Sequence, residues 1–418
     1  YDSDLSAQSL ATQERATIDS SAVPRMLTLY GVGDHGGGPT MEMLERSHDL
    51  KRIPAFPVVR DASPTDALTK MRAAFPATGP VVRDELYLEY HRGVFTTQTE
   101  MKWWNRHMEG LLDAAEAAAT VAPGPYPHDA LTAAWHTTLF NQFHDLLSGS
   151  GIDSIYVDAV DDYRKANALA EGALATSLRA LTAPLDTRPL RPGDVPMVAF
   201  NPSGVARAGV VSFAPPAGGD GVDSASAWTA IDAGGRALPS EPGDSGRIKV
   251  RVDTVPALGA SVFFMRPAPL HLAATVPGWT LENRYLRVTI DSVTGGIASM
   301  YDKVHQRDVL AGGPAANGLL LMVDLPKDYD AWNIDNLNGA RTWLVARADD
   351  AHPTVTRDAF GSAITVYRGK DSSLVTQRYE LPADADRLDI ETTVGWHQSH
   401  QLLKAVFPLA FHVDSTHA

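Results

Sequence analysis

The sequence predicts a multidomain protein whose parts are, in chain order, α/β, α and β. Three patterns indicate this. Strand-like and helical segments alternate in the first part of the chain, and a helical period of about 3.6 dominates residues 98–181. Alternation with period two follows the proline-rich stretch Ala183–Pro196. We expect four domains, namely 1–97, 98–185, a small β domain at 186–270 and a larger β domain at 271–418. A length of 418 residues allows roughly two to four domains of about 100–150 residues.

The composition excludes several classes of protein. Hydrophobic residues make up 44% of the chain and charged residues 21%, which is typical of a soluble globular protein. No apolar run approaches the roughly 20 residues that span a bilayer, so we expect no membrane span. The formal net charge of −14 repels a phosphate backbone, so nucleic acid is not an expected partner. The absence of cysteine excludes disulfides and thiolate metal sites, and it leaves the compartment open between cytoplasm and periplasm.

The first part of the chain has the pattern of an α/β unit. The predicted strands are Arg25–Tyr30, Ala55–Arg60 and Glu85–Tyr90, and the predicted helices are Ala7–Ser20, Met41–Leu50 and Pro64–Phe75. Strands that alternate with helices indicate a parallel sheet. Such apolar strands need cover on both faces, which three strands do not supply, so we expect the start of the chain to be incomplete.

The second part predicts a three-helix bundle. Its helical segments are Thr99–Val121, His128–Leu147 and Ser154–Leu181. The proline-rich stretch Ala122–Pro127 ends the first helix, because proline lacks a backbone donor and restricts the residue before it. Ser148–Gly151 ends the second helix.

The third part has strand and turn patterns. Strands are predicted at Met197–Asn201, Gly209–Ala214, Arg247–Val252, Ser261–Arg266, Tyr285–Asp291 and Ile297–Tyr301. Thr294, Gly295 and Gly296 predict a hairpin turn between the last two. The chain ends soon after the apolar run Leu402–Val413, without the turn and surface cover of a natural domain end, so we expect truncation there as well.

A glycine-rich loop, Gly31–Thr40, follows the first predicted strand and contains Asp34 and His35. Loops after strands carry the active sites of α/β folds. A dinucleotide-binding loop does not fit, because Pro39 interrupts the helix start, and a P-loop lacks its lysine. A carboxylate beside a histidine favours a catalytic or ligand site, and a plain glycine turn is the alternative.

A second candidate is the pair His144 and Asp145, which the pattern places in the last turn of a helix. The helix dipole is negative there and favours a cation, so a metal ligand is physically reasonable for His144. The alternative is a capping histidine beside a solvated aspartate.

Two further segments combine polar and aromatic side chains. Glu89, His91 and Arg92 lie at the end of a predicted strand, before a helix that contains Trp103 and Trp104. This combination suits a sugar, whose faces are apolar and whose edges carry hydroxyls, although an ion pair over an aromatic core explains it equally well. The loop Leu325–Asp335 contains three acids and two aromatics, among them Asp330 and Trp332, and turn chemistry explains most of it.

In this order, the segments resemble glycoside hydrolase family 38 α-mannosidases of bacterial type. The resemblance lies in GDHGGGPT from Gly33, ELYLEYHRGVFTTQ from Glu85 with MKWWN from Met101, FNQFHDLLSGSGI from Phe140, FNP from Phe200, NRYL from Asn283, GGI from Gly295 and YDAW from Tyr329. It covers nearly the whole chain. It implies the C-terminal part of a catalytic α/β barrel, then the three-helix bundle, then β-sandwich-type domains, in a chain truncated at both ends.

The resemblance also implies an activity. Members of the family are exo-acting and cleave terminal α-mannosides with retention, through a covalent mannosyl-enzyme. They use one divalent ion, usually Zn²⁺, which binds sugar hydroxyls. The expected partner is therefore a mannose-containing oligosaccharide.

Residue by residue, His144 matches a zinc ligand of the family and Asp145 a carboxylate that contacts sugar hydroxyls. Asp34 lies in the loop that bears the general acid/base, although in some relatives the acid aligns with His35. His35, His91, Arg92, Asp330 and Trp332 are the remaining candidates for substrate binding.

The family's first zinc ligands and its aspartate nucleophile precede residue 1. We therefore expect this chain alone to be inactive, and to need the missing N-terminal half of the barrel or a second chain that supplies it. A homo-oligomer is a further possibility. The alternative function is a non-catalytic carbohydrate-binding or assembly subunit with the same fold.

Overall fold

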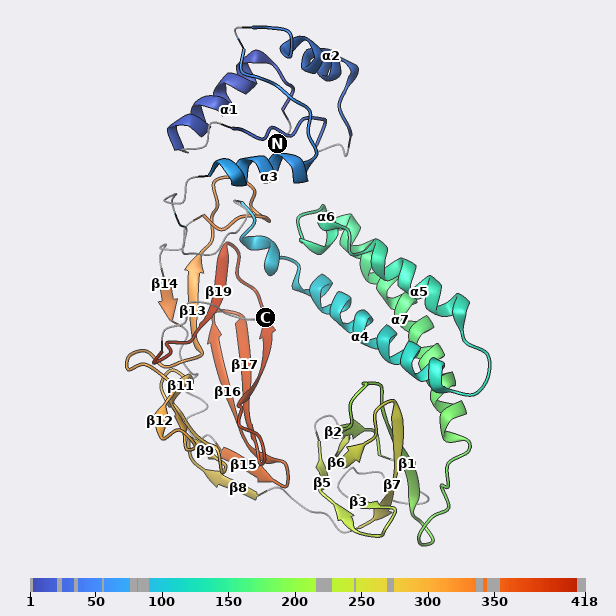
Figure 1. Ribbon diagram of the computed structural model, residues 1–418. Coiled ribbons are helices and arrows are strands. Elements are labelled where there is room, and N and C mark those ends of the chain that lie inside the picture. Colours follow the sequence, from blue (N-terminus) through green and yellow to red (C-terminus); the bar gives the residue numbers. More distant parts are fainter. Residues whose placement is uncertain are drawn as a thin grey trace. The chain divides into compact units, whose positions relative to one another are not determined.

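The computed structural model in Figure 1 describes residues 3–20, 25–33, 37–54, 56–75, 81, 90–215, 228–243, 246–268, 274–335, 341–343 and 354–411. The chain divides into two compact units, Tyr1–Leu86 and Tyr87–Ala418. Each unit has a hydrophobic core of its own.

The helices predicted in the first unit are present. They are α1 (Ala7–Ser20), α2 (Met41–Leu50) and α3 (Pro64–Ala74). The Thr40 hydroxyl accepts a hydrogen bond from the Met43 amide at 3.2 Å, and the Ser63 hydroxyl caps α3 in the same way. These side chains satisfy amides that have no partner within their helix, which fixes where each helix begins.

The parallel sheet predicted for the first unit is wrong for the strands that the structure describes. Arg25–Tyr30 makes a single parallel bridge, from Tyr30 to Ser3, and residues 56–60 form no strand. A strand needs a hydrogen-bonded neighbour along its length. Among the described residues, this segment has one backbone hydrogen bond of that kind, from the Ser3 amide to the Leu29 carbonyl at 3.1 Å. Most of the third predicted strand lies outside the described residues.

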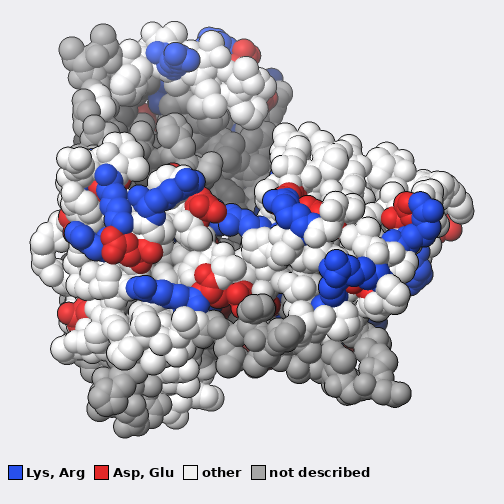
Figure 2. Space-filling model, turned by 90° about the horizontal axis from the view of Figure 1, so that it is seen from below, with Lys and Arg blue, Asp and Glu red and all other residues white. Residues whose placement is uncertain are grey.

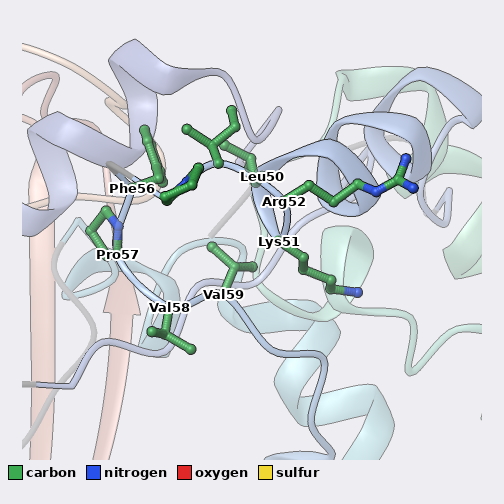
Figure 3. Close-up of a pocket in the computed structure, with 9 residues that line it drawn as sticks. Leu50, Lys51, Arg52, Phe56, Pro57, Val58 and Val59 are labelled. Carbon is green, nitrogen blue, oxygen red and sulfur yellow. The ribbon is translucent and has the colours of Figure 1, made fainter.

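Apolar side chains of these segments are consequently open to solvent. Leu27, Leu29 and Val58 are 38%, 52% and 83% exposed. The core of the unit is small, with Leu5, Leu10 and Leu50 buried and Tyr30, Phe56 and Val59 packed against them. Beside it, Leu50–Pro54 and Phe56–Val59 line a hollow of about 250 Å³ (Figure 3).

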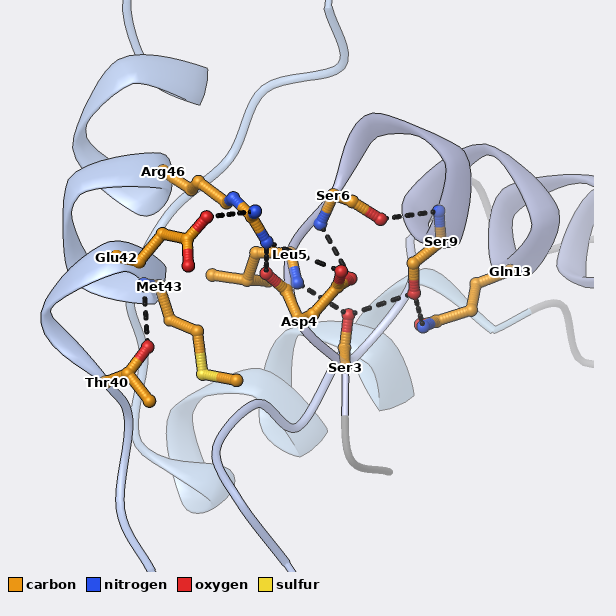
Figure 4. Close-up of polar contacts among 10 residues, drawn as sticks. All are labelled: Ser3, Asp4, Leu5, Ser6, Ser9, Gln13, Thr40, Glu42, Met43 and Arg46. Carbon is orange, nitrogen blue, oxygen red and sulfur yellow. Dashed lines mark hydrogen bonds and ion pairs between the residues drawn. The ribbon is translucent and has the colours of Figure 1, made fainter.

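A polar cluster joins α2 to the chain segment before α1 (Figure 4). Arg46 of α2 donates to the Asp4 carbonyl at 2.9 Å and pairs with the Asp4 carboxylate at 3.4 Å. The Ser6 amide donates to the same carboxylate at 2.9 Å, and this hydrogen bond, more than Arg46, lowers the pKa of Asp4. The cluster is exposed, so it aligns the two segments without much stabilisation.

The helices of the second unit pack around one core. They are α4 (Thr99–Val121), α5 (His128–Phe140), α6 (His144–Leu147) and α7 (Asp153–Thr182), preceded by the short 3₁₀ turn Gly93–Phe95. Met101, Met108 and Leu112 recur on one face of α4 and are buried with Leu131 and Tyr163. No helix in the described ranges is long and apolar enough to cross a membrane.

The helix predicted at His128–Leu147 is broken, which corrects the position of His144. The backbone of Phe143 is extended, with φ −55° and ψ 140°, so α5 ends at Phe140 and α6 begins at His144. The Gln142 side chain holds the break by donating to Asn105 at 2.9 Å and to Glu109 at 3.1 Å, both on α4. His144 is therefore the first residue of a four-residue helix and not part of a last turn.

The strands that follow the helices form two antiparallel sheets around a shared core. One sheet has the order β1-β7-β3-β4 and the other β2-β6-β5. Their bounds are β1 Val195–Asn201, β2 Arg207–Phe213, β3 Trp228–Asp232, β4 Ala237–Leu238, β5 Ser240–Pro242, β6 Ile248–Val255 and β7 Gly259–Pro267. The four strands predicted here are confirmed to within about three residues at each end.

The remaining strands form three more sheets, with the orders β12-β11-β10-β9, β18-β17-β16-β15-β8 and β14-β13-β19. Their bounds are β8 Ala274–Pro277, β9 Thr280–Glu282, β10 Leu286–Ile290, β11 Ile297–Asp302, β12 Arg307–Asp308, β13 Gly318–Val323, β14 Arg341–Trp343, β15 Thr354–Asp358, β16 Gly361–Lys370, β17 Ser373–Pro382, β18 Asp389–Gly395 and β19 Gln401–Val406. The predicted β10–β11 hairpin is confirmed, with Ile290 opposite Ile297. The protein is thus largely antiparallel β, with helices.

A buried arginine lies where these sheets meet. Arg368 of β16 is fully buried and donates to the carbonyls of Asn317, at 2.9 Å, and Gly295, and to the Tyr379 hydroxyl at 2.8 Å. The Tyr379 hydroxyl in turn donates to the Gly295 carbonyl at 2.8 Å. Burial lowers the pKa of Arg368 and raises that of Tyr379. One guanidinium therefore holds the hairpin turn and the start of β13 against β16 and β17.

Charges are mixed on the surface that Figure 2 shows. Basic and acidic side chains lie next to one another there and do not gather into a broad basic area.

Replacing Gly295 by alanine should destabilise the β10–β11 hairpin more than Gly235→Ala destabilises the turn between β3 and β4. Both glycines have left-handed backbones, with φ +68° and +83°, which cost alanine about 1–2 kcal/mol. A Cβ at Gly295 would also lie 2.5 Å from Val366 and 2.8 Å from Arg368, whereas Gly235 faces open space. We expect an additional loss of about 1–3 kcal/mol at Gly295 from this overlap.

The measurement is the free energy of opening of the strands that flank each turn, by hydrogen exchange. Equal losses for Gly295→Ala and Gly235→Ala would show that the Arg368 cluster tolerates the extra carbon.

Candidate functional site

Three segments that are distant in the sequence meet at the turn formed by residues 93–97. The Gly93 amide donates to the Trp332 carbonyl at 2.7 Å, and the Thr97 hydroxyl donates to the Ala331 carbonyl at 2.9 Å across 234 residues of sequence. The third segment is Ser148–Gly149, at the end of α6. We call this meeting point the junction.

Four of the predicted substrate-binding residues lie in or next to two of these segments: His91 and Arg92 before the turn, and Asp330 and Trp332 in the 325–335 loop. The His91 ring packs edge-on against Trp332 with centroids 4.9 Å apart, and Tyr90 contacts Tyr329 at 5.3 Å. Arg92 Nη1 donates to the Ile334 carbonyl at 3.5 Å. The junction therefore brings His91 and Arg92 together with the loop that carries Asp330 and Trp332.

The absence of a side chain at Gly93 permits this contact. A Cβ there would lie 3.0 Å from the Trp332 carbonyl oxygen and 3.2 Å from that of Ala331. The two backbones thus approach closely enough for a direct hydrogen bond, which positions the loop without using any of its side chains.

Backbone and a lysine connect the α6 segment to the same turn. Lys102 Nζ donates to the Thr97 carbonyl and, at 3.1 Å, to the Ser148 carbonyl. Gly149, with φ +84°, lies so close that a Cβ would be 2.4 Å from the Thr97 carbonyl oxygen. The position of α6 is therefore fixed relative to the turn.

His144 and Asp145 are adjacent and accessible at the start of α6. His144 Nε2 lies 3.5 Å from Asp145 Oδ1, and their side chains are 73% and 54% exposed. The pair offers one imidazole nitrogen and one carboxylate. Within the described ranges, no three His, Asp or Glu side chains are grouped so that they could hold a metal ion.

The acids in the 325–335 loop and just before it have different surroundings. Asp335 performs turn chemistry, since it accepts from the Lys327 amide at 2.6 Å and from the Asn333 side chain. Burial first, and then the charge of Asp330, raises the pKa of Asp324. Asp330 itself is exposed, beside the aromatic contacts of the junction.

Asp34 and His35 lie outside the described residues. The residues on either side of them form a tight turn, in which the Gly37 amide donates to the Val32 carbonyl at 2.8 Å and the Val32 amide to Gly38 at 3.3 Å.

Sequence reasoning missed the residues that build the junction, namely Gly93, Thr97 and Lys102. All three stand within segments that carry the family resemblance, so a signal existed. Their partners are backbone carbonyls, however, and no sequence pattern identifies which carbonyl a distant amide or ammonium will reach.

Comparisons with known proteins match the regions that contain all three segments of the junction. Residues 89–181 match the family described as the α-mannosidase middle domain, and residues 281–418 match the C-terminal domain of glycosyl hydrolases family 38. α-Mannosidase 2C1 of Mus musculus is 27% identical over 398 residues, which are 91% of this chain and 35% of that protein. The α-mannosidase of Saccharomyces cerevisiae is 36% identical over 146 residues, which are 31% of this chain and 13% of that protein.

A solved structure agrees at the level of the fold. The crystal structure of an α-mannosidase from Enterococcus faecalis V583 superposes with a TM-score of 0.66 at 18% identity, over 96% of this chain and 53% of that one. The chain spans about a third of the length of the curated mouse relative.

Replacing Gly93 by alanine should loosen the 325–335 loop. The new Cβ has to displace the Trp332 carbonyl, at a cost of about 1–3 kcal/mol, and it weakens the hydrogen bond between them. Trypsin cleavage after Lys327, which is exposed in this loop, should accelerate roughly tenfold because the loop opens more often.

Gly110→Ala is the matched control. Gly110 lies within α4 and faces open space, so alanine should stabilise that helix by about 0.5–1 kcal/mol and leave cleavage at Lys327 unchanged. Unchanged cleavage in Gly93→Ala would mean that the loop is held by other contacts.

Proposed function

Because this chain belongs to glycoside hydrolase family 38, we propose that the protein containing it is a retaining, exo-acting α-mannosidase that acts on mannose-containing oligosaccharides. One observation carries the proposal, the junction. It joins the two regions that match mannosidase domains through the Gly93 to Trp332 hydrogen bond, and it collects His91, Arg92 and Trp332. The mouse and yeast relatives that align with this chain are named α-mannosidases.

The junction has the chemistry of a sugar subsite. Rings such as His91 and Trp332 offer apolar faces to the carbon skeleton of a pyranose. Arg92 and Asp330 supply a donor and an acceptor for hydroxyl groups, and Asp145 is the third polar candidate. We assign substrate binding to these five residues, with His35 as a sixth.

Retaining hydrolysis requires two carboxylates about 5–5.5 Å apart, one as nucleophile and one as general acid/base. We propose Asp34 as the acid/base, or the position of His35 where a relative has its acid there. We further propose that the nucleophile comes from outside these 418 residues, as part of the N-terminal half of the barrel or of a second chain.

His144 is proposed as one ligand of a zinc ion. The described residues do not complete such a site, since a zinc site takes about four ligands and the exposed pair of His144 and Asp145 offers at most two. The remaining ligands must therefore come from elsewhere in the protein. A zinc ion bound there would supply Lewis acidity toward the hydroxyls of a sugar.

The exposed apolar side chains of the first unit also fit an alternative function, that of a non-catalytic carbohydrate-binding or assembly subunit. Leu29 and Val58 are 52% and 83% exposed on segments that have no strand neighbour beyond Ser3 in the described ranges. Such surfaces favour assembly with a further barrel segment. A non-catalytic carbohydrate-binding or assembly subunit would use the same surface, and turnover of an aryl α-mannoside by the whole protein separates the two candidates.

In the whole protein, His144→Ala should reduce kcat/KM on an aryl α-mannoside by at least about a hundredfold, because a zinc site loses one of about four ligands. Zinc affinity, measured by competition with a chelator, should fall in parallel. His128→Ala, which removes an exposed histidine of α5, is the control and should change neither quantity. Wild-type rates at low free zinc in His144→Ala would exclude the ligand role.

The 418-residue polypeptide expressed alone should be inactive on the same substrate, bind zinc weakly and associate. Under this proposal it lacks a nucleophile and has too few metal ligands, and Leu27, Leu29 and Val58 are exposed. Turnover assays with added zinc, calorimetric zinc titration and light scattering test the three expectations. Robust turnover by a monodisperse sample would overturn the proposal that the nucleophile lies outside this chain.

A further inference from the structure

We propose that Lys102 is a positioning residue that holds the α6 segment and the 93–97 turn in one fixed arrangement. The importance of this role rests on the proposed function. The candidate metal ligand His144 lies on α6, and the candidate sugar-binding residues His91 and Arg92 directly precede the 93–97 turn. The Lys102 ammonium donates to backbone carbonyls, those of Thr97 and Ser148, so it is not assigned a catalytic role.

The location of Lys102 is unfavourable for its own helix. It is the fourth residue of α4, where the unpaired amides give the helix a partial positive charge that opposes a cation. The side chain is also partly buried, and this burial lowers the pKa of Lys102. Helix stability and solvation therefore do not explain the lysine, whereas the carbonyls that it reaches do.

The first carbonyl belongs to Thr97. The hydroxyl of the same residue donates to the Ala331 carbonyl at 2.9 Å, and Gly93, four residues earlier, donates to the Trp332 carbonyl. By holding the Thr97 backbone, Lys102 therefore also helps to position the loop that carries Asp330 and Trp332.

The second carbonyl belongs to Ser148. The Ser148 amide donates to the His144 carbonyl at 3.2 Å, so Ser148 closes the single turn that begins with His144 and Asp145. Figure 1 shows α6 and the start of α4 at the same end of the helices. Lys102 therefore lies one short helical turn from the candidate metal ligand.

The contact of Gly149 with Thr97 makes a fixed arrangement possible. The two backbones touch so closely that a side chain at Gly149 would overlap the Thr97 carbonyl. The close contact brings two carbonyls toward one ammonium, and the ammonium offsets their mutual repulsion. Without it, the turn and α6 should separate more easily and move independently.

The test compares Lys102→Met, which keeps the apolar stem and removes the charge, with wild type in the whole protein. Hydrogen exchange is followed in peptides that cover 143–151, 328–335 and, inside α4, 108–118. We expect exchange in the first two peptides to accelerate at least about tenfold, because a hydrogen bond from a charged donor is lost, and exchange inside α4 to stay unchanged. Lys102→Gln is a second neutral variant with the same expected pattern.

Two controls define the outcome. Lys102→Arg keeps a cation and should restore most of the protection. Lys165→Met removes an exposed lysine that pairs with Asp161 on α7, and it should alter none of the three peptides. Unchanged exchange in the 143–151 and 328–335 peptides, or an equal rise in all three, would overturn the proposal.

The exchange experiment needs neither zinc nor sugar, so it decides the role of Lys102 even if the protein proves inactive on mannosides. If activity is present, kcat/KM of Lys102→Met should fall while Lys102→Arg retains most of it.

Discussion

Residues 93 and 332 share a hydrogen bond at a separation that leaves little room for a side chain at position 93, and this contact places the loop of Asp330 and Trp332 beside His91 and Arg92. It is made between backbones, so it fixes the distance between a helical region and a β region without constraining the side chains on either. Thr97 adds a second contact to the same loop and Lys102 extends the connection to α6. The junction thus brings His91 and Arg92 next to the loop that carries Asp330 and Trp332, and it fixes α6 near the same turn.

In the C-terminal region, a buried hydrogen-bond cluster around Arg368 holds the sheets together. The charge of Arg368 is buried among neutral oxygens, and the carbonyls of Gly295 and Asn317 and the Tyr379 hydroxyl together take the place of water. Removing one partner from such a cluster leaves a buried charge or a buried acceptor unsatisfied, which costs more than the cluster contributes when intact. The cluster therefore specifies one arrangement of the hairpin turn, β13, β16 and β17 more than it adds stability.

All six strands that the sequence predicted in the second unit are present, because each finds its neighbour within the chain and alternation reports directly which face is buried. The long strands β16 and β17 were not predicted. The prediction failed for Arg25–Tyr30, where apolar composition indicates a buried strand but only Ser3 is available as a neighbour in the described part of the unit. It also continued one helix through Phe143, since the break depends on the side-chain hydrogen bonds of Gln142 to α4. His91, Arg92, Asp330 and Trp332 were singled out from the combination of polar and aromatic residues and from the resemblance, whereas the groups that hold them together were not.

The backbone nature of the junction has an evolutionary consequence. Substitutions at positions 90–92 and 329–332 can change the shape and polarity of the surface presented to a ligand, while the amide and carbonyl that join the segments are common to almost every residue type. Position 93 is restricted by its close approach to Trp332, and Tyr90 and Tyr329 by their left-handed backbones, with φ +65° and +60°. A lineage can therefore explore new glycan preferences at these positions while the two regions stay attached, so specificity and architecture can diversify at different rates.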